Sequence, residues 1–255
     1  FVKIVYPYKD VYKYMFFPYI YIIMKIFLTF GTSGEYEKRA ERIVLLIKKL
    51  DIFDKIILST ETDLKKDSIF WNQHGKFIES NKRGYGYWLW KSYMIKKQLE
   101  MLNENDILLY LDSSIIFRAS KDKFIDLFNI VKRDYIIGSY CKVKCLEYVW
   151  NKMDLIENLN MNNDRYLNTR QRQAGSIMIL NNKKTRELIN NWYTLSSQYH
   201  FIDDTKSNKK NKEGFKEHRH DQSIFSLLTK KYNIYSNIDM FAYLNLWPLK
   251  HSRPL

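Results

Sequence analysis

The sequence predicts an α/β fold in which helices cover both faces of a mostly parallel central sheet. From Lys25 onward, short apolar runs alternate with amphipathic segments, as expected for repeated strand–helix units. Hydrophobic residues make up 45% of the 255-residue chain and aromatic residues 16%, which excludes global disorder. Neither an internal repeat nor a clear linker divides the chain, so a single domain is the expected organisation.

The first half of the pattern begins with the apolar run KIFLTF, which predicts a strand over 25–30. Ala40, Ile43 and Ile47 share one face of the helix expected over 35–50. KIILS predicts a strand at 55–59, the polar TETDLKK a loop, and FIES a short strand at 77–80. An aromatic helix over 86–102 then precedes DILLYLD at 106–112, the most apolar run, which predicts the central strand.

The second half continues the alternation with amphipathic segments that predict helices at 121–131, 146–159, 183–195 and 220–231. Apolar runs predict strands at 134–140, 174–180 and 232–236. The stretch 203–217 is polar, basic and without period, so we expect a mobile surface loop there.

The N-terminal segment permits two interpretations. Residues 14–30 are apolar enough to suggest a membrane span, but Pro18 and Lys25 interrupt them and they are short for a bilayer. Alternatively, Met24 begins a strand and a Gly/Ser/Thr loop, which is typical of a natural start. We favour the second interpretation: residues 1–23 form an extension or translated upstream sequence, and 24–255 form a single domain.

The chain is strongly basic, with 42 Lys and Arg against 28 Asp and Glu, a net charge of +14. Such a surface attracts nucleic acid, anionic lipid or nucleotide phosphates, although a Lys-rich composition with solvated side chains explains most of the excess. Cys141 and Cys145 fit neither a disulfide framework nor a zinc pattern, which favours a reducing compartment. We therefore expect a cytoplasmic protein and leave peripheral contact with a membrane open.

Several familiar catalytic motifs are missing from the sequence. It has no Walker A, GxGxxG, HExxH or GxSxG pattern. The dinucleotide-binding, P-loop, zinc-protease and serine-hydrolase classes are therefore disfavoured.

The segment KRGYGYWLWKSY at 82–93 places Arg83 and Lys91 around an aromatic turn that opens a helix. Helix N-termini and guanidinium groups bind phosphate, and Tyr87 and Trp88 could stack on a base or sugar. The alternative is an aromatic core helix with two cations that extend to solvent.

The segment LLYLDSS ends the expected central strand on Asp112. A carboxylate at the carboxyl end of a parallel strand lies where open α/β sheets bind ligands, and it can hold a hard divalent cation. The alternative is that Asp112 caps a turn.

The segment HRHDQSIFSLL at 218–228 opens an amphipathic helix with Asp221 and Gln222. His218 and His220 could ligate a metal, but such pairs are common on basic surfaces, and Asp221 could simply offset the helix dipole. The preceding loop is of the kind that closes over substrates.

The order of these segments, followed by QAGSIMILN, NNWY and HDQS, resembles nucleotide-sugar glycosyltransferases of the GT-A fold. The resemblance is closest to small bacterial and viral proteins with a GYWLWKPY-like segment, and more distant to glycogenin-like and capsular-sugar transferases. It covers Lys25 to the C-terminus. In those families a DXD-type motif at a strand end binds a metal and the donor diphosphate, and a later NAG…N…W…DQ series shapes the sugar and acceptor pocket.

The resemblance implies a GT-A (Rossmann-like) nucleotide-diphospho-sugar transferase fold with a divalent cation, Mn²⁺ or Mg²⁺. It implies catalytic roles for Asp221 and Gln222, and metal binding by Asp112 and His251. The donor would contact Arg83, Tyr87, Trp88, Lys91, Asp112, Ser114 and Gly175. Two departures stand against it: Asp112-Ser113-Ser114 keeps only the first acid of DXD, and WKSY lacks the usual proline.

The predicted function is transfer of a sugar from a UDP- or GDP-sugar to a glycan, polysaccharide or lipid-linked acceptor, without a specific nucleic-acid partner. Asp221 is the expected base if the reaction inverts, with Glu147 and Asp154 as alternatives. Three rival functions remain: a nucleic-acid-binding protein without catalysis, a degenerate transferase, and a metal-dependent phosphoesterase that uses Asp112, His220 and Asp221.

Overall fold

The structure is a computed structural model that describes residues 22–248. Its strands are β1 (Lys25–Gly31), β2 (Lys55–Thr60), β3 (Ile107–Leu111), β4 (Ile115–Phe117), β5 (Ile136–Tyr140), β6 (Arg172–Leu180) and β7 (Leu246–Pro248). The longer helices are α1 (Glu35–Leu50), α3 (Ser68–Ser80), α5 (Leu89–Met101), α6 (Lys121–Asp134), α10 (Lys183–Ser196) and α11 (His220–Tyr232). The shorter ones are α2 (Glu61–Lys66), α4 (Gly84–Tyr87), α7 (Glu147–Trp150), α8 (Met153–Asn158), α9 (Asp164–Leu167), α12 (Met240–Tyr243) and the 3₁₀ turn η1 (Tyr199–Phe201).

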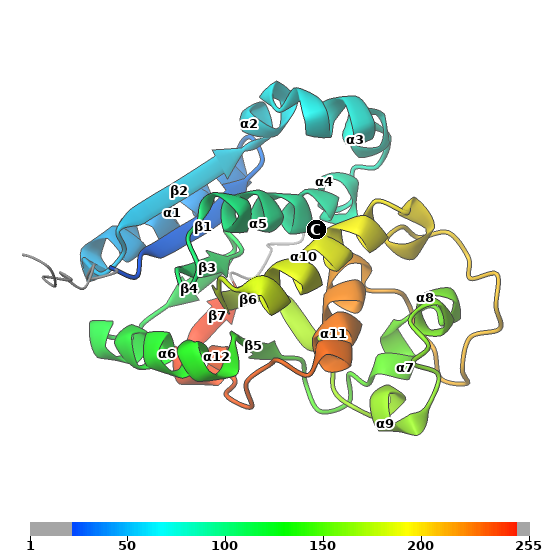
Figure 1. Cartoon of the computed structure of the whole chain (residues 1–255). Coiled ribbons are helices and arrows are strands. Elements are labelled where there is room, and N and C mark those ends of the chain that lie inside the picture. The colour runs from blue at the N-terminus through cyan, green and yellow to red at the C-terminus, as the bar shows by residue number, and fades with distance from the viewer. Residues whose placement is uncertain (1–21, 249–255) are drawn as a thin grey trace, which may run out of the picture.

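The central sheet has five strands in the order β2-β1-β3-β6-β5 (Figure 1). Strand β1 pairs in parallel with β2 and β3, whereas β6 is antiparallel to both β3 and β5. Four strands therefore run in one direction and only β6 is reversed, which confirms the predicted α/β class with a mostly parallel sheet. Strands β4 and β7 form a separate antiparallel pair.

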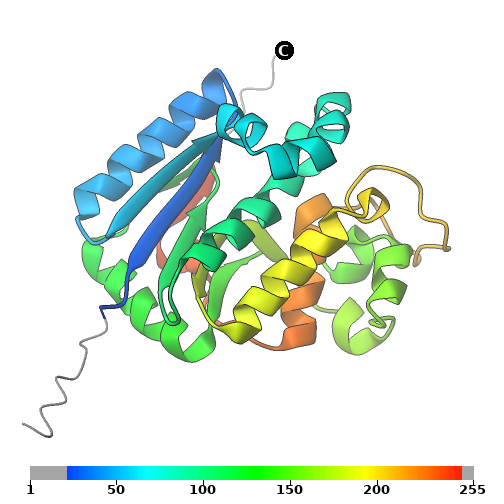
Figure 2. The same cartoon turned by 45° about the horizontal axis from the view of Figure 1, so that its top comes forward.

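Helices cover both faces of the sheet, as the alternating pattern predicted. Figure 2 shows α1 on one side of the sheet and α5 with α10 on the other. One core joins α1, α6 and α12 to the sheet, and the other joins α5, α10 and α11 to it. Strand β3 is buried along its whole length between these two cores, as expected for the most apolar run.

Strand β6 contains a bulge that shapes the edge of the sheet. Gly138 pairs with Ile177, but the next residue, Ser139, pairs with Gln173, so residues 174–176 have no partners on β5. On the other side of β6, the Asp112 amide donates to the Gly175 carbonyl at 2.8 Å. The bulge therefore holds Gly175 beside the residue that follows β3.

Two predictions between β2 and α5 were wrong. The expected loop TETDLKK forms α2, because Thr60 and Asp63 make a capping box in which the Asp63 carboxylate accepts the Thr60 N–H at 2.8 Å. The expected strand FIES is the last turn of α3. This helix is capped by Asp67, and it buries Phe70, His74 and Ile78 at helical spacing.

Two predictions in the second half were also wrong. The helix expected over 146–159 is divided into α7 and α8, because Asn151 and Lys152 have extended backbone angles. No strand forms at 232–236, since α11 continues to Tyr232 and ends with Asn233 in the left-handed conformation. The last strand is β7 instead.

The segment 203–217 lacks helix and strand, as predicted, but side chains anchor it. The Asp203 carboxylate accepts from the buried Lys152 ammonium at 3.1 Å, and Asp154 accepts the backbone N–H groups of Asn208 and Lys209. Its mobility stays a prediction. Most of the expected extension 1–23 lies outside the described residues, and so does His251.

Candidate active site

A cleft of about 750 Å³, the first cleft, opens at the sheet edge where β1 and β3 end. It receives residues from the turns after β1 and β3, from the β6 bulge, from the turn before α5 and from the start of α11. Aromatic side chains line much of its wall, namely Phe30, Tyr36, Tyr85, Trp88 and Trp90. Aromatic faces such as these can stack on the ring of a base or a sugar.

A left-handed turn precedes α5 and forms one wall. All five residues from Gly84 to Trp88 have positive φ, between 52° and 81°. Only two of them are glycine, and the other three each cost about 1–2 kcal/mol. The Trp90 indole N–H donates to the Gly84 carbonyl at 3.1 Å and helps to hold the turn. Strained backbone of this kind clusters at functional sites. The strained residues belong to the segment 82–93, for which the sequence predicted phosphate and sugar binding.

Lys91 lies at the floor of the first cleft and joins two of the predicted site residues. Its ammonium lies 3.2 Å from Oδ1 of Asp112 and 2.9 Å from Oδ2 of Asp221, and its side chain is only 3% exposed. Burial acts to lower the pKa of Lys91, but the two carboxylates outweigh it and raise the pKa. Lys91 is therefore a permanent cation that bridges two segments far apart in sequence.

Asp112 is held on three sides. Besides Lys91, its Oδ1 accepts the Tyr110 hydroxyl at 2.6 Å. Burial and the Asp112 charge raise the pKa of Tyr110 well above its usual value, so Tyr110 remains a donor. On the third side, a Cβ added to Gly175 would lie 2.6 Å from Oδ2 of Asp112, so only glycine leaves room for this carboxylate.

Asp221 stands opposite Asp112 in the first turn of α11. Its side chain is 6% exposed, and the indole N–H of Trp192 donates to its backbone carbonyl at 3.0 Å. Burial raises the pKa of Asp221 to about 6, although Lys91 acts in the other direction. A carboxylate with a pKa close to neutrality is suited to accept a proton. The hydrogen bond from Trp192 to Asp221 joins the predicted NNWY and HDQS segments at this site.

The side chains that the structure describes around Asp112 do not form a ligand set for a divalent cation, and the predicted ligand His251 lies outside them. The ammonium of Lys91 stands between Asp112 and Asp221, in the place that a shared ion would take. Ser114 lines the cleft but brings no second carboxylate. Within residues 22–248 no group of three His, Cys, Asp or Glu side chains is arranged to hold a metal.

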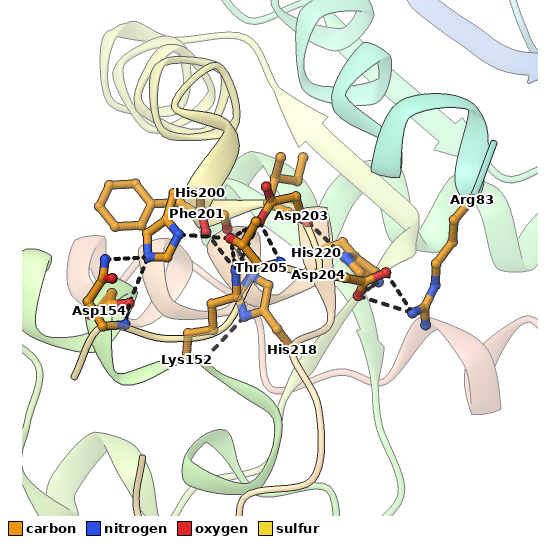
Figure 3. A network of polar contacts seen from close by, with 12 residues as sticks. Arg83, Lys152, Asp154, His200, Phe201, Asp203, Asp204, Thr205, His218 and His220 are labelled. Atoms are coloured by element: carbon orange, nitrogen blue, oxygen red, sulfur yellow. Dashed lines mark hydrogen bonds and ion pairs between the residues drawn. The ribbon is translucent and has the colours of Figure 1, made fainter. Parts of the chain in front are cut away.

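Arg83 lines the mouth of the first cleft and is paired with the loop that precedes α11. Its guanidinium lies 3.1 Å from Asp204 and 3.7 Å from Glu217. Figure 3 shows Arg83 extended toward Asp204, with His220 beyond it. The side chains of this ion pair are nearly half exposed, so the pair is weak and a ligand can compete for the guanidinium.

The two histidines before Asp221 hold the loop. His218 accepts the Lys152 N–H at 3.2 Å and contacts the Phe201 carbonyl at 2.8 Å, and Nδ1 of His220 contacts the Ile202 carbonyl at 2.7 Å (Figure 3). Burial lowers the pKa of His218 to about 3, so it is neutral. Both ring nitrogens of His218 and Nδ1 of His220 serve these backbone contacts, whereas Nε2 of His220 lies 3.7 Å from Asp204. The engagement of His218 disfavours a metal site formed by the two histidines.

The remaining predicted donor and catalytic residues are divided between the wall and the interior. Trp88, Ser114 and Gly175 line the first cleft. Tyr87 is 9% exposed, does not line the cleft and packs against His220 with ring centroids 4.9 Å apart. Gln222 reaches the lining, but its amide donates to the Gln171 side chain at 2.8 Å.

The two alternative bases do not line the first cleft. Glu147 is fully buried, where it pairs with Lys230 and accepts from Ser226. Asp154 is bound to His200 at 2.7 Å (Figure 3). Both therefore serve as internal partners for other groups.

Tyr110 and Glu217 were missed by the sequence analysis. Tyr110 precedes Asp112 by two positions, so strand alternation places both side chains on one face and could have predicted their contact. Nothing local to the sequence indicates that Glu217 faces Arg83, because a long irregular connection brings it there.

The chain was compared with protein families, curated proteins and solved structures. No family model and no curated protein matches the chain. Mouse xyloside xylosyltransferase 1 in its apo form is similar at 11% identity and a TM-score of 0.47, over 85% of this chain and 86% of that chain. The galactosyltransferase LgtC, solved with donor and acceptor sugar analogues, is similar at 16% identity and a TM-score of 0.44, over 83% and 72%. Neither likeness is close enough to bear on substrate or reaction.

Proposed function

We propose that the protein transfers a sugar from a nucleotide-diphosphate donor to a hydroxyl group of a glycan, polysaccharide or lipid-linked acceptor. The observation that carries the proposal is the pair of carboxylates, Asp112 and Asp221, bridged by Lys91 at the floor of an aromatic cleft. The cleft lies at the carboxyl ends of β1 and β3, where α/β sheets bind ligands. The ordered segments that resemble GT-A transferases supply the residues that line it.

In the reaction, the bond from the anomeric carbon to the donor diphosphate breaks, and a bond to the acceptor oxygen forms. In an inverting transfer, the acceptor proton passes to Asp221, which is mostly ionised at neutral pH since its pKa is about 6. The Lys91 ammonium orients Asp221 and lies where the departing diphosphate gains negative charge. Gly175 leaves space for close approach of the sugar.

Other basic residues of the first cleft supply cations for the diphosphate. Lys82, Arg83 and Arg219 line it, and arginine can bind a phosphate with two parallel hydrogen bonds. The lining also contains four carboxylates, those of Glu61, Asp112, Glu217 and Asp221, which are acceptors for sugar hydroxyl groups. Binding of the donor therefore competes with the Arg83 contacts to Asp204 and Glu217.

A divalent cation and the base of the donor, uracil or guanine, remain predictions, and no step above depends on the cation. Cytoplasmic location with peripheral membrane contact is likewise part of the proposal. Among residues 22–248, no helix is both long and apolar enough to cross a bilayer.

A thermal-shift titration with UDP, GDP and other nucleoside diphosphates, with and without Mn²⁺ or Mg²⁺, tests the proposed function. A ligand that binds the native state raises Tm. We expect a rise with UDP or GDP; a metal-dependent rise should be lost in Asp112→Asn and retained in the exposed control Asp122→Asn. A rise without metal assigns the phosphates to the cationic side chains; a rise only with metal shows that an ion binds with the nucleotide.

An unchanged Tm with every nucleotide would contradict the proposed function. The nucleic-acid alternative would then need steeply salt-dependent binding to DNA or RNA. Nucleotide binding without transfer to any acceptor would instead identify a degenerate transferase.

A further inference from the structure

A second cleft of about 640 Å³ opens where β5 ends and β6 begins. Tyr140 ends β5 and Arg172 begins β6, and both line this second cleft. Because β6 runs against its neighbours, its first residues lie at the same sheet edge as the ends of β1 and β3. Arg172 and Gly175 are three residues apart, so their Cα atoms are at most about 11 Å apart. The clefts therefore approach each other along β6, while the start of α11 lines the first and its end lines the second.

The two clefts differ sharply in charge. The first is balanced, with four basic and four acidic residues: Lys82, Arg83, Lys91, Arg219, Glu61, Asp112, Glu217 and Asp221. The second has four basic residues and one acidic residue: Arg165, Arg170, Arg172, Lys230 and Asp239. The second cleft therefore has the field that attracts an anion.

The acidic groups near the second cleft are already engaged. Glu147 lies beneath it, fully buried, and pairs with Lys230. The Asp239 carboxylate accepts the N–H of Tyr140 at 3.3 Å and that of Phe241 at 3.1 Å. Four basic residues set against Glu147 and Asp239 leave an excess of two positive charges around the second cleft.

The three guanidinium groups of the second cleft make no ion pair with a carboxylate in the part of the chain that the structure describes. Arg170 donates to the Cys141 carbonyl, and Arg165 lies 5.6 Å from the Tyr166 ring centre. Arg172 lies 4.2 Å from the Tyr235 ring centre, and its Nε and Nη1 are buried without an acceptor among residues 22–248. Unpaired buried donors on a cation are costly, and an oxyanion with several lone pairs is the complementary group.

We propose that the second cleft binds an anionic group of the acceptor, a phosphate or a carboxylate carried by the glycan whose hydroxyl enters the first cleft. The inference rests on the proposed function for naming the ligand as the acceptor. Arg165, Arg170 and Arg172 attract the anion by their positive charge, and the first cleft receives the neutral sugar hydroxyl. The acceptor is therefore an acidic or phosphorylated glycan, which the basic cleft selects over a neutral one.

Calorimetric titration with glucose phosphate, glucuronate and glucose at fixed ionic strength tests the inference. We expect at least one acidic sugar to bind and glucose not to bind. Arg172→Gln and Arg165→Gln should each weaken that binding about tenfold, the loss of one charge-assisted contact. Arg165 is exposed, so its variant keeps the test valid even if Arg172→Gln fails to fold. Arg186→Gln removes the same charge far from both clefts and should have no effect.

The two acidic probes distinguish the sources of the anion. Selective binding of glucose phosphate identifies a phosphate-bearing acceptor, and selective binding of glucuronate an acidic sugar. Equal binding in wild type and both cleft variants, or equal binding of glucose, would overturn the inference. UDP titration of the same variants should match wild type. If no nucleotide binds at all, the proposed function fails, while the arginine dependence still decides whether the second cleft binds anions.

Discussion

The Lys91 ammonium lies 2.9 Å from Oδ2 of Asp221, and both side chains are almost completely buried. The attraction within a buried ion pair stabilises the fold only by the amount that exceeds the cost of removing both charges from water. Asp112 contributes a second carboxylate to the same ammonium at 3.2 Å, so the three groups together carry one excess negative charge when both acids are ionised. This excess accounts for the different predicted effects of changing each member.

Replacing Lys91 with Met should strongly destabilise the protein, because two carboxylates would lose the cation that they share. Removing one member of a buried pair typically costs about 3–5 kcal/mol. Urea unfolding at neutral pH measures the change in the free energy of unfolding. Adding Asp221→Asn to Lys91→Met should restore part of the stability. A single variant within about 1 kcal/mol of wild type would show that the pair is not formed.

The stability should fall between about pH 4 and pH 6 because of Asp221. Its folded pKa, about 6, is above the unfolded value near 3.8, so the folded state holds the proton more tightly. The stabilising contribution is complete below the unfolded pKa and is lost as pH rises through the folded pKa, in total roughly 3 kcal/mol. Urea unfolding across this range should show the decline in wild type, and Asp221→Asn should lack it. Parallel curves for both proteins would refute the assignment.

Replacing Gly175 with Ala should impair nucleotide binding while the fold persists. The new Cβ would lie 2.6 Å from Oδ2 of Asp112, so the carboxylate or the β6 bulge must shift. Overpacking of this kind costs about 1–3 kcal/mol. Nucleotide affinity of Gly175→Ala, Asp112→Asn and the double variant forms the test. The two effects should be less than additive, because both act through Asp112; strict additivity would argue against that coupling.

Replacing Asp204 with Asn should strengthen nucleotide binding several-fold, because it releases Arg83 from its closer partner. Stability should change by less than about 0.5 kcal/mol, since the pair is exposed. The control is Glu104→Gln, which breaks an exposed pair with Arg186 far from the cleft and should leave nucleotide affinity unchanged. Weaker binding in Asp204→Asn would mean that Arg83 does not contact the nucleotide.

Whether a segment forms a helix or a strand was predictable where a periodic hydrophobic pattern extended over many residues, or where polar residues bounded an apolar run. The strand that ends before Asp112 and the helix over 35–50 illustrate this. Predictions failed for short segments. The four-residue run FIES alternates like a strand, yet it belongs to a longer helix whose cap, Asp67, lies well upstream. In TETDLKK the capping-box residues were visible in the sequence, but the polar composition of the segment favoured a loop.

The sequence by itself determined the α/β class, the order of most elements, and the residues of the first cleft that lie at strand and helix ends. It could do so because periodicity and apolar runs are local properties. Only the tertiary structure decided that Lys91 bridges Asp112 and Asp221, that Glu217 faces Arg83, and that three arginines share a second cleft. These contacts join segments far apart in the chain, and they depend on the reversed strand β6 and on loop paths that no local pattern encodes.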